Sequence, residues 1–157
     1  MALTLSLSGI TVKFDKFLDT DYPRTVIQNA TLEFSVAGTP ALSGSHFAPK
    51  HIWAVNAICD TQQRDAIELI AHEFHEKRRA LQDSDILILD TTATIKERSP
   101  ATRAVVGGTT VLTLNGGVHL AYFAQFKGIL SENLKFSKTG KIDFVSFVLT
   151  ETVRVPA

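Results

Sequence analysis

The sequence runs TTVLTLNGGVHLAYFAQF from Thr109 to Phe126, and this stretch decides the fold class. Its centre, Asn115-Gly116, is a strong β-hairpin signal because both central residues of the favoured turn need positive φ. From Val118 to Phe126 apolar side chains recur at every second position, which is the period of a half-buried strand. The stretch therefore predicts two antiparallel strands, Thr109 to Leu114 and Val118 to Phe126, joined by a tight turn.

The same kind of pattern continues towards the C-terminus. Leu134 and Phe136 begin another predicted strand, a turn follows at Lys138-Thr139-Gly140-Lys141, and a long last strand is expected from Ile142 to Val155. Apolar side chains occupy both faces of that last strand, with one set on each face: Phe144 and Val148, and then Val145, Phe147 and Leu149. Apolar residues on both faces indicate that both are covered, and one cover could be a partner chain.

Shorter strands are expected upstream. The leucines at 3, 5 and 7 alternate with polar residues, and Ile10, Val12 and Phe14 continue the alternation one residue out of phase. We therefore expect a bulge or bend at Ser8-Gly9 that shifts the buried face. Further strands are predicted over Val26 to Val36, His51 to Ile58 and Ile86 to Leu89. Exposed loops are predicted over residues 15–23, 38–45 and 96–100.

One helix is predicted, and it begins near Asp60. Asp60 and Gln63 have the spacing of a capping box, in which each side chain accepts a hydrogen bond from the other residue's backbone amide. An apolar stripe with helical spacing follows, made of Ile67, Ile70, Phe74 and Leu81. Lys77, Arg78 and Arg79 lie in the last turns, where the helix dipole favours positive charge. The helix should therefore pack one side onto a sheet.

Together these patterns predict one domain over residues 1–157 with a mostly β (α+β) fold. We expect about eight strands in an antiparallel β-sandwich or small barrel, flanked by one α-helix. The length of 157 residues and the 45% hydrophobic and 20% charged content fit a single globular domain. No signal peptide is apparent at the N-terminus, and no segment has the apolar length of a membrane span.

Charge and cysteine content narrow the classes of function. Lys plus Arg and Asp plus Glu both number 16, so net charge provides no reason to expect nucleic-acid binding or an acidic membrane surface. A neutral protein also lacks self-repulsion and associates more readily. Cys59, the single cysteine, cannot form an intrachain disulfide and lies in an apolar run where a buried thiol is expected.

Several residue groups contain side chains that could form a chemical site. His72 and His75 are three apart on the predicted helix, whereas the zinc-protease motif needs histidines four apart. His46, His51 and His119 have no spacing that fixes a site. Cys59 precedes the helix, where a lowered pKa could make it a nucleophile, but no flanking motif supports this.

The remaining groups also favour structural interpretations. Gly107-Gly108 and Gly116-Gly117 lack phosphate-loop spacing and are interpreted as hairpin turns. The residues Asp83, Asp85 and Asp90 lack the spacing of a calcium loop. A cluster of Phe123, Phe126 and Lys127 does not amount to a nucleic-acid motif. The sequence thus assigns no catalytic, cofactor-binding or metal-binding residue, and we expect no enzyme and no cofactor.

The order of elements resembles that of the tail-tube and baseplate ring proteins of tailed bacteriophages. The resemblance rests on segments 53–58, 61–81, 86–90 and 143–151, which read WAVNAI, the predicted helix, ILILD and DFVSFVLTE. It covers most of the chain and includes no diagnostic motif. It implies a tail-tube-like fold with strands first, a central helix and a hairpin-rich second half.

In function, the resemblance implies a structural subunit that assembles into a ring, with a hexamer favoured, around the tail channel. Its partners would be other copies of the chain and other tail or baseplate proteins, without a membrane or specific nucleic-acid binding. The protein would be made in the host bacterial cytoplasm and located in the virion. Residues 38–46 and 96–103 would be loops that reach neighbours.

Two other classes of function stay open. A carbohydrate- or ligand-binding β-sandwich could use Trp53 and Tyr122-Phe123 as an aromatic platform. A metal-dependent enzyme could use His72 and His75.

Overall fold

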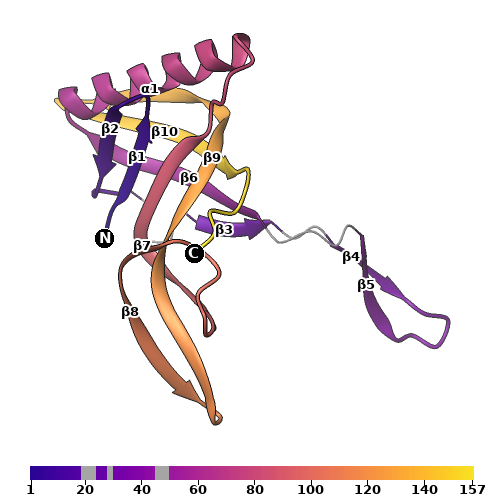
Figure 1. Cartoon of the computed structure of the whole chain (residues 1–157). Coiled ribbons are helices and arrows are strands. Elements are labelled where there is room, and N and C mark those ends of the chain that lie inside the picture. The colour runs from indigo at the N-terminus through magenta and orange to yellow at the C-terminus, as the bar shows by residue number, and fades with distance from the viewer. Residues whose placement is uncertain (19–23, 28–29, 45–49) are drawn as a thin grey trace.

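The computed structural model describes residues 1–18, 24–27, 30–44 and 50–157 (Figure 1). These residues form a mostly β structure with one α-helix, and every strand pair is antiparallel, as the sequence predicts. In chain order the elements are β1 (Leu3–Leu7), β2 (Ile10–Phe14), β3 (Arg24–Ile27), β4 (Ala30–Phe34), β5 (Pro40–Gly44), β6 (Lys50–Cys59), α1 (Thr61–Arg79), β7 (Ile86–Arg98), β8 (Val105–Leu114), β9 (Gly117–Thr139) and β10 (Ile142–Glu151).

The main sheet has the strand order β2-β1-β7-β9-β10-β6-β3, and β8 pairs with β9. After β2 the chain crosses to β6 at the far side of this sheet. There Phe17 forms an isolated bridge with Ala57, and the Leu18 amide donates to the Asn56 carbonyl at 2.9 Å. The two sides of the sheet therefore come together, and the sheet curls around one core like a small, partly closed barrel.

A tight hairpin turn at Ser8-Gly9 joins β1 to β2, where the sequence predicts a bulge or bend. Both turn residues have positive φ, 52° for Ser8 and 78° for Gly9. In this hairpin Leu7 pairs with Ile10 and Leu5 with Val12. Residues paired across an antiparallel ladder share a face, so a two-residue turn produces the one-residue phase shift without a bulge.

The core fills the inside of the curled sheet. Trp53 and Phe126 meet edge to face with ring centroids 5.0 Å apart, and Phe14 and Phe147 are 5.7 Å apart. All four rings are buried, and both distances lie in the range of favourable aromatic pairs. The last strand ends at Glu151 instead of the predicted Val155, and its two faces differ: Val145, Phe147 and Leu149 are buried, while Phe144 and Val148 are half-buried.

Helix α1 packs across one end of the curled sheet (Figure 1). The predicted capping box is present: the Gln63 amide donates to Asp60 Oδ1 at 2.8 Å, and the Asp60 amide donates to Gln63 Oε1 at 2.9 Å. Ile67, Ile70 and Phe74 are buried as predicted. Leu81 was wrongly included in the stripe: the helix ends at Arg79, and Leu81 is 95% exposed with a φ of 57°.

Several predicted boundaries were wrong because strand pairing extends further than the local pattern indicates. The segment Val26 to Val36 is divided between β3 and β4, and residues 40–44, which were predicted to be a loop, form β5, which pairs with β4. Strand β7 continues through the predicted loop as far as Arg98, and β9 joins two predicted strands into one of 23 residues. Gly107-Gly108 is not a hairpin turn: it lies at a register shift within β8, where Gly107 has a φ of 77°.

The buried stripe of α1 provides a stability prediction. Replacement of Phe74 by alanine should lower the free energy of unfolding by about 3–5 kcal/mol, because a fully buried ring is lost and a cavity remains. Leu69 lies on the same helix but is 52% exposed, so Leu69→Ala is the matched control and should change the free energy of unfolding by less than about 0.5 kcal/mol. Urea unfolding followed by circular dichroism measures both, and equal effects of the two substitutions would contradict this helix orientation.

Candidate functional site

A network of buried charged side chains lies where β6 begins, at the opposite end of that strand from α1. Its first centre is Asp90, which is fully buried on β7. Asp90 Oδ2 accepts from Arg24 Nη1 at 3.0 Å and from Trp53 Nε1 at 3.1 Å, while Oδ1 accepts from the Thr92 amide at 2.8 Å. A buried carboxylate is tolerated when it is paired and hydrogen-bonded in this way.

The second centre is Glu151 at the end of β10. Glu151 Oε2 accepts from the His51 amide at 2.9 Å and lies 2.8 Å from His51 Nδ1, and Oε1 accepts from Arg103 Nη1. Burial alone would raise the pKa of Glu151, but the hydrogen bonds from His51 and Arg103 and the positive charge of Arg103 outweigh it and hold the pKa at about 2. Glu151 is therefore an anion at neutral pH.

The Phe126 ring joins the two centres. The guanidinium carbons of Arg24 and Arg103 lie 5.3 and 5.0 Å from the ring centroid, within the range of cation–π contacts. The His51 ring meets Phe126 edge to face at 5.2 Å. One aromatic side chain thus contacts two arginines from segments far apart in the sequence.

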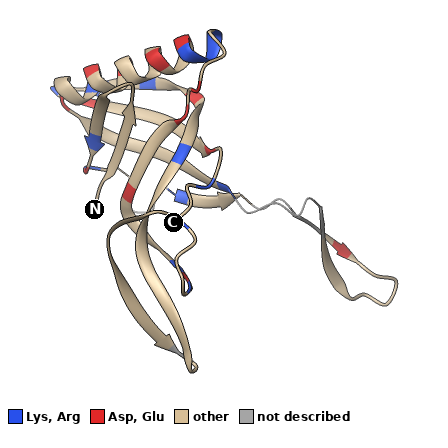
Figure 2. Cartoon of the chain, viewed as in Figure 1, with Lys and Arg blue, Asp and Glu red and all other residues tan. Residues whose placement is uncertain are grey.

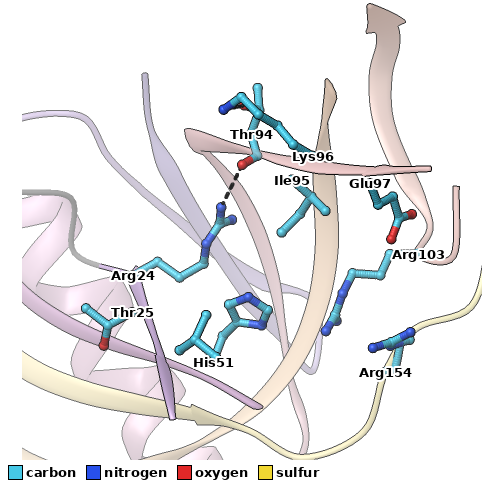
Figure 3. Close-up of a pocket in the computed structure, with 10 residues that line it drawn as sticks. Arg24, Thr25, His51, Thr94, Ile95, Lys96, Glu97, Arg103 and Arg154 are labelled. Atoms are coloured by element: carbon cyan, nitrogen blue, oxygen red, sulfur yellow. Dashed lines mark hydrogen bonds between the residues drawn. The ribbon is translucent and has the colours of Figure 1, made fainter. Parts of the chain in front are cut away.

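A cleft of about 440 Å³ opens above this network (Figure 3). Four cationic side chains line it: Arg24 from β3, Lys96 from β7, Arg103 from the segment before β8, and Arg154 after β10. Figure 3 shows these side chains around the same hollow, with His51 between Arg24 and Arg103. Burial lowers the pKa of Arg24, and the nearby charge of Arg103 lowers it further, although Asp90 partly offsets both.

Glu97 is the only carboxylate among the residues that line the cleft in the described part of the chain. It accepts from the Thr102 hydroxyl at 2.8 Å and from the Tyr122 hydroxyl at 2.7 Å. Burial raises the pKa of the Tyr122 hydroxyl, and the hydrogen bond to Glu97 raises it further. Glu97 is thus held by protein donors on the side of the cleft near Arg154.

The histidines considered from the sequence lie in different places. His72 and His75 are both exposed on α1. His51 belongs to the buried network, His119 is half-buried on β9, and His46 lies outside the described residues. Among residues 1–18, 24–27, 30–44 and 50–157, no group of three or more His, Cys, Asp or Glu side chains is placed to hold a metal ion.

Cys59 is buried at the end of β6, and its thiol faces the Asp143 carbonyl at 3.8 Å. Burial raises the pKa of this thiol, and the charge of Asp143 raises it further. The thiolate form that a nucleophile requires is therefore disfavoured, in contrast to the lowered pKa considered for a position before a helix.

The other residues considered from the sequence are also separated. Asp90 is buried beside Arg24, whereas Asp83 is exposed and Asp85 is half-buried. Trp53 and Tyr122 are almost fully buried, so they do not form an exposed aromatic platform for a sugar. Phe126 is buried below the cleft, and Gly116 forms the predicted hairpin turn with Asn115, with φ values of 75° and 49°.

Two hairpins project from the curled sheet, and both are poor in charge (Figure 2). One is the arm, which we define as residues 30–44 with strands β4 and β5. Between Arg24 and Lys50 the only charged residue is Glu33. The other is the long hairpin of β8 and the start of β9, and no Asp, Glu, Lys or Arg occurs between Arg103 and Lys127.

Apolar side chains on both hairpins are exposed. On the arm, Leu32 pairs with Leu42 across the ladder, and Phe34, two residues along on the same face, is 65% exposed. Val111 and Val118 are exposed on the long hairpin. In Figure 1 the arm lies apart from the curled sheet, and its two strands contact chiefly each other. Soluble proteins usually protect such edges with charged residues, so these surfaces are suited to pairing.

Comparisons with known proteins do not identify a relative. No protein-family model matches the chain, no curated protein matches it, and no solved structure matches it. Among the described residues, no helix combines the length and apolar character needed to cross a membrane.

The acid sensitivity of the fold should depend on Glu151. Its folded-state pKa of about 2 lies below that of a carboxyl in the unfolded chain, so the unfolded state binds a proton first as the pH falls. The stabilisation from Glu151 is therefore complete above about pH 5 and is lost as the pH falls to 2, a decrease of about 3 kcal/mol.

The variant Glu151→Gln isolates this contribution, because a glutamine cannot titrate. Unfolding free energies at pH 6 and pH 2 give the difference between wild type and variant at each pH. That difference should shrink by about 3 kcal/mol between pH 6 and pH 2. A difference independent of pH would contradict the low pKa of Glu151.

Proposed function

We propose that this chain is a structural subunit of a phage tail or baseplate that assembles with other copies of itself into a ring. The observation that carries the proposal is the pair of charge-poor hairpins that project from the curled sheet. The arm exposes Leu32, Phe34 and Leu42, and the long hairpin exposes Val111 and Val118. A monomer gains nothing from apolar side chains held away from its core, whereas burying them against a neighbour is favourable.

The edge of β8 supports the same proposal. Strand β8 spans ten residues and contains no charged residue, and among the described strands it pairs on one side only, with β9. An uncharged edge strand can add to the sheet of a neighbouring chain through its backbone groups. Repeated head-to-tail contacts of this kind close into a ring when the rotation between copies is suitable.

The element order supports a further part of the proposal, which is the location of the ring. Its resemblance to tail-tube and baseplate proteins favours six copies around a tail channel, with further tail proteins as neighbours. On this proposal the protein is located in the virion and the exposed hairpins are its contacts. The role is structural, so it requires no catalytic residue.

Substitutions in the arm test whether the chain assembles through it. The double variant Leu32→Thr/Phe34→Thr removes apolar surface while it retains residues that favour strands. Burial of each side chain in an interface stabilises it by roughly 1.5–3 kcal/mol, so the variant should associate at least about a hundredfold more weakly. Leu69→Gln, a substitution of an exposed leucine on α1, is the matched control and should assemble like wild type.

The measurement is light scattering of untagged protein over a wide concentration range, with negative-stain images of the same samples. Wild type and Leu69→Gln should form closed rings or tubes, and the arm variant should stay monomeric at the same concentrations. Normal assembly of the arm variant would show that the arm is not a contact. A wild-type chain that stays monomeric, alone and with authentic tail proteins, would contradict the ring.

A further inference from the structure

The floor of the cleft contains an arginine that uses little of its hydrogen-bonding capacity within the described residues. The side chains of Arg24 and Arg103 are only 7% and 4% exposed. Arg24 is well satisfied, since it donates to Asp90 and to the carbonyls of Ala93 and Thr94 at 3.2 and 3.3 Å. Arg103 donates only through Nη1, to Glu151, among the described residues. A guanidinium has five N–H donors, so most of those of Arg103 have no hydrogen-bond partner among the described residues.

The rim of the cleft contains two more cations, and both donate to hydroxyl groups. Lys96 Nζ donates to the Thr94 hydroxyl at 3.1 Å, and Arg154 Nη1 donates to the Thr102 hydroxyl at 3.3 Å. Neither forms an ion pair within the part of the chain that the structure describes. Both therefore retain charge and donors that can turn towards a bound anion.

The charges around the cleft do not balance. Asp90 and Glu151 lie below Arg24 and Arg103 and neutralise them one to one. Glu97 then offsets only one of the two rim cations, Lys96 and Arg154, so one positive charge remains in excess. Like charges repel more strongly at a partly buried site than in water, and a bound anion would relieve this repulsion.

The volume and lining of the cleft indicate the class of ligand. A volume of about 440 Å³ lies within the roughly 300–1,000 Å³ of small-molecule sites and far exceeds the space of one water. Guanidinium groups bind carboxylates and phosphates through paired N–H donors in a plane. The cations come from four separate segments, so a ligand would be held from several sides.

We propose that this cleft is a binding site for a small oxyanion of the carboxylate or phosphate class. Arg103 binds it from the floor, and Lys96 and Arg154 bind it from the rim. The ordinary alternative is a polar network that only stabilises the fold, and this alternative requires no ligand and no contribution from the rim. The site does not depend on ring formation, so the two proposals can fail separately.

The single tryptophan provides the readout. Arg103 lies over the Phe126 ring, and Phe126 meets Trp53 edge to face at 5.0 Å, so an anion bound by Arg103 should change Trp53 fluorescence. The purified full chain is titrated at pH 7 with sodium acetate in one arm and sodium phosphate in the other, with sodium chloride keeping the ionic strength constant. At least one anion should give a saturable change and a concentration-dependent rise in Tm. The anion that saturates at the lower concentration identifies the class.

Substitutions of the two rim cations distinguish specific anion binding in the cleft from a general effect of salt on the protein. Arg154→Gln and Lys96→Gln leave both buried carboxylates paired, so they should fold normally and bind at least tenfold more weakly. Arg79→Gln removes an exposed arginine at the end of α1 and should bind like wild type. Phosphate stabilises many proteins without a site, so the comparison between variants decides. The proposal is overturned if neither anion saturates in fluorescence or Tm, or if all three variants respond like wild type.

Discussion

Strand β6 is paired along both of its edges, and the closed shape of the molecule depends on this. One edge pairs with β10 from Ile52 to Cys59. The other edge pairs with residues 16–18 near its end and with β3 near its beginning. Because β6 joins the start of the chain to its last strand, the sheet must curl, and the curl creates an inside. Every second side chain of β6 then points into that core.

The alternation of inward and outward side chains along β6 also determines where the polar network lies. The buried row of β6 consists of His51, Trp53, Val55, Ala57 and Cys59. His51 and Trp53 are the first members of this row and carry polar N–H groups, so their burial requires acceptors. Glu151 and Asp90 supply these acceptors from neighbouring strands. Two arginines then pair with the carboxylates, since a buried carboxylate without a cation would be far more costly than the pair.

Patterns in the sequence predict those structural elements that are determined by contacts between residues close together in the chain. The period of two identified the strands around Asn115-Gly116, and the spacing of Asp60 and Gln63 identified the helix start. Periodicity shows which residues share a face but not whether another element covers that face, so the predicted strand Val26 to Val36 could not show that Leu32 and Phe34 are exposed. The seven-residue spacing from Phe74 to Leu81 matched a helix that had already ended. Residues 40–44 have no apolar periodicity that predicts a strand, so their pairing with β4 could not be inferred from the sequence.

The cleft was missed for a different reason. Arg24 and Asp90 are 66 residues apart, and Arg103 and Glu151 are 48 apart. No spacing rule links such pairs, because the strand order brings them together and that order is set by the whole sheet. A usable signal was present in the composition: Arg24 and Arg103 each begin a long stretch poor in charge, which marks them as the last charged residues before the projecting hairpins.

That position connects the cleft to the hairpins. Arg24 lies on β3, which leads towards the arm, while Arg103 directly precedes β8 of the long hairpin. Both guanidinium groups contact one ring, Phe126, and line one cleft. An anion bound by Arg103 and the two rim cations would hold the root of the long hairpin, beside Arg24 at the root of the arm, and would restrain the direction in which the long hairpin leaves the curled sheet. In a subunit that assembles through those hairpins, such a restraint lowers the conformational entropy lost on assembly and so strengthens association without any new contact between subunits.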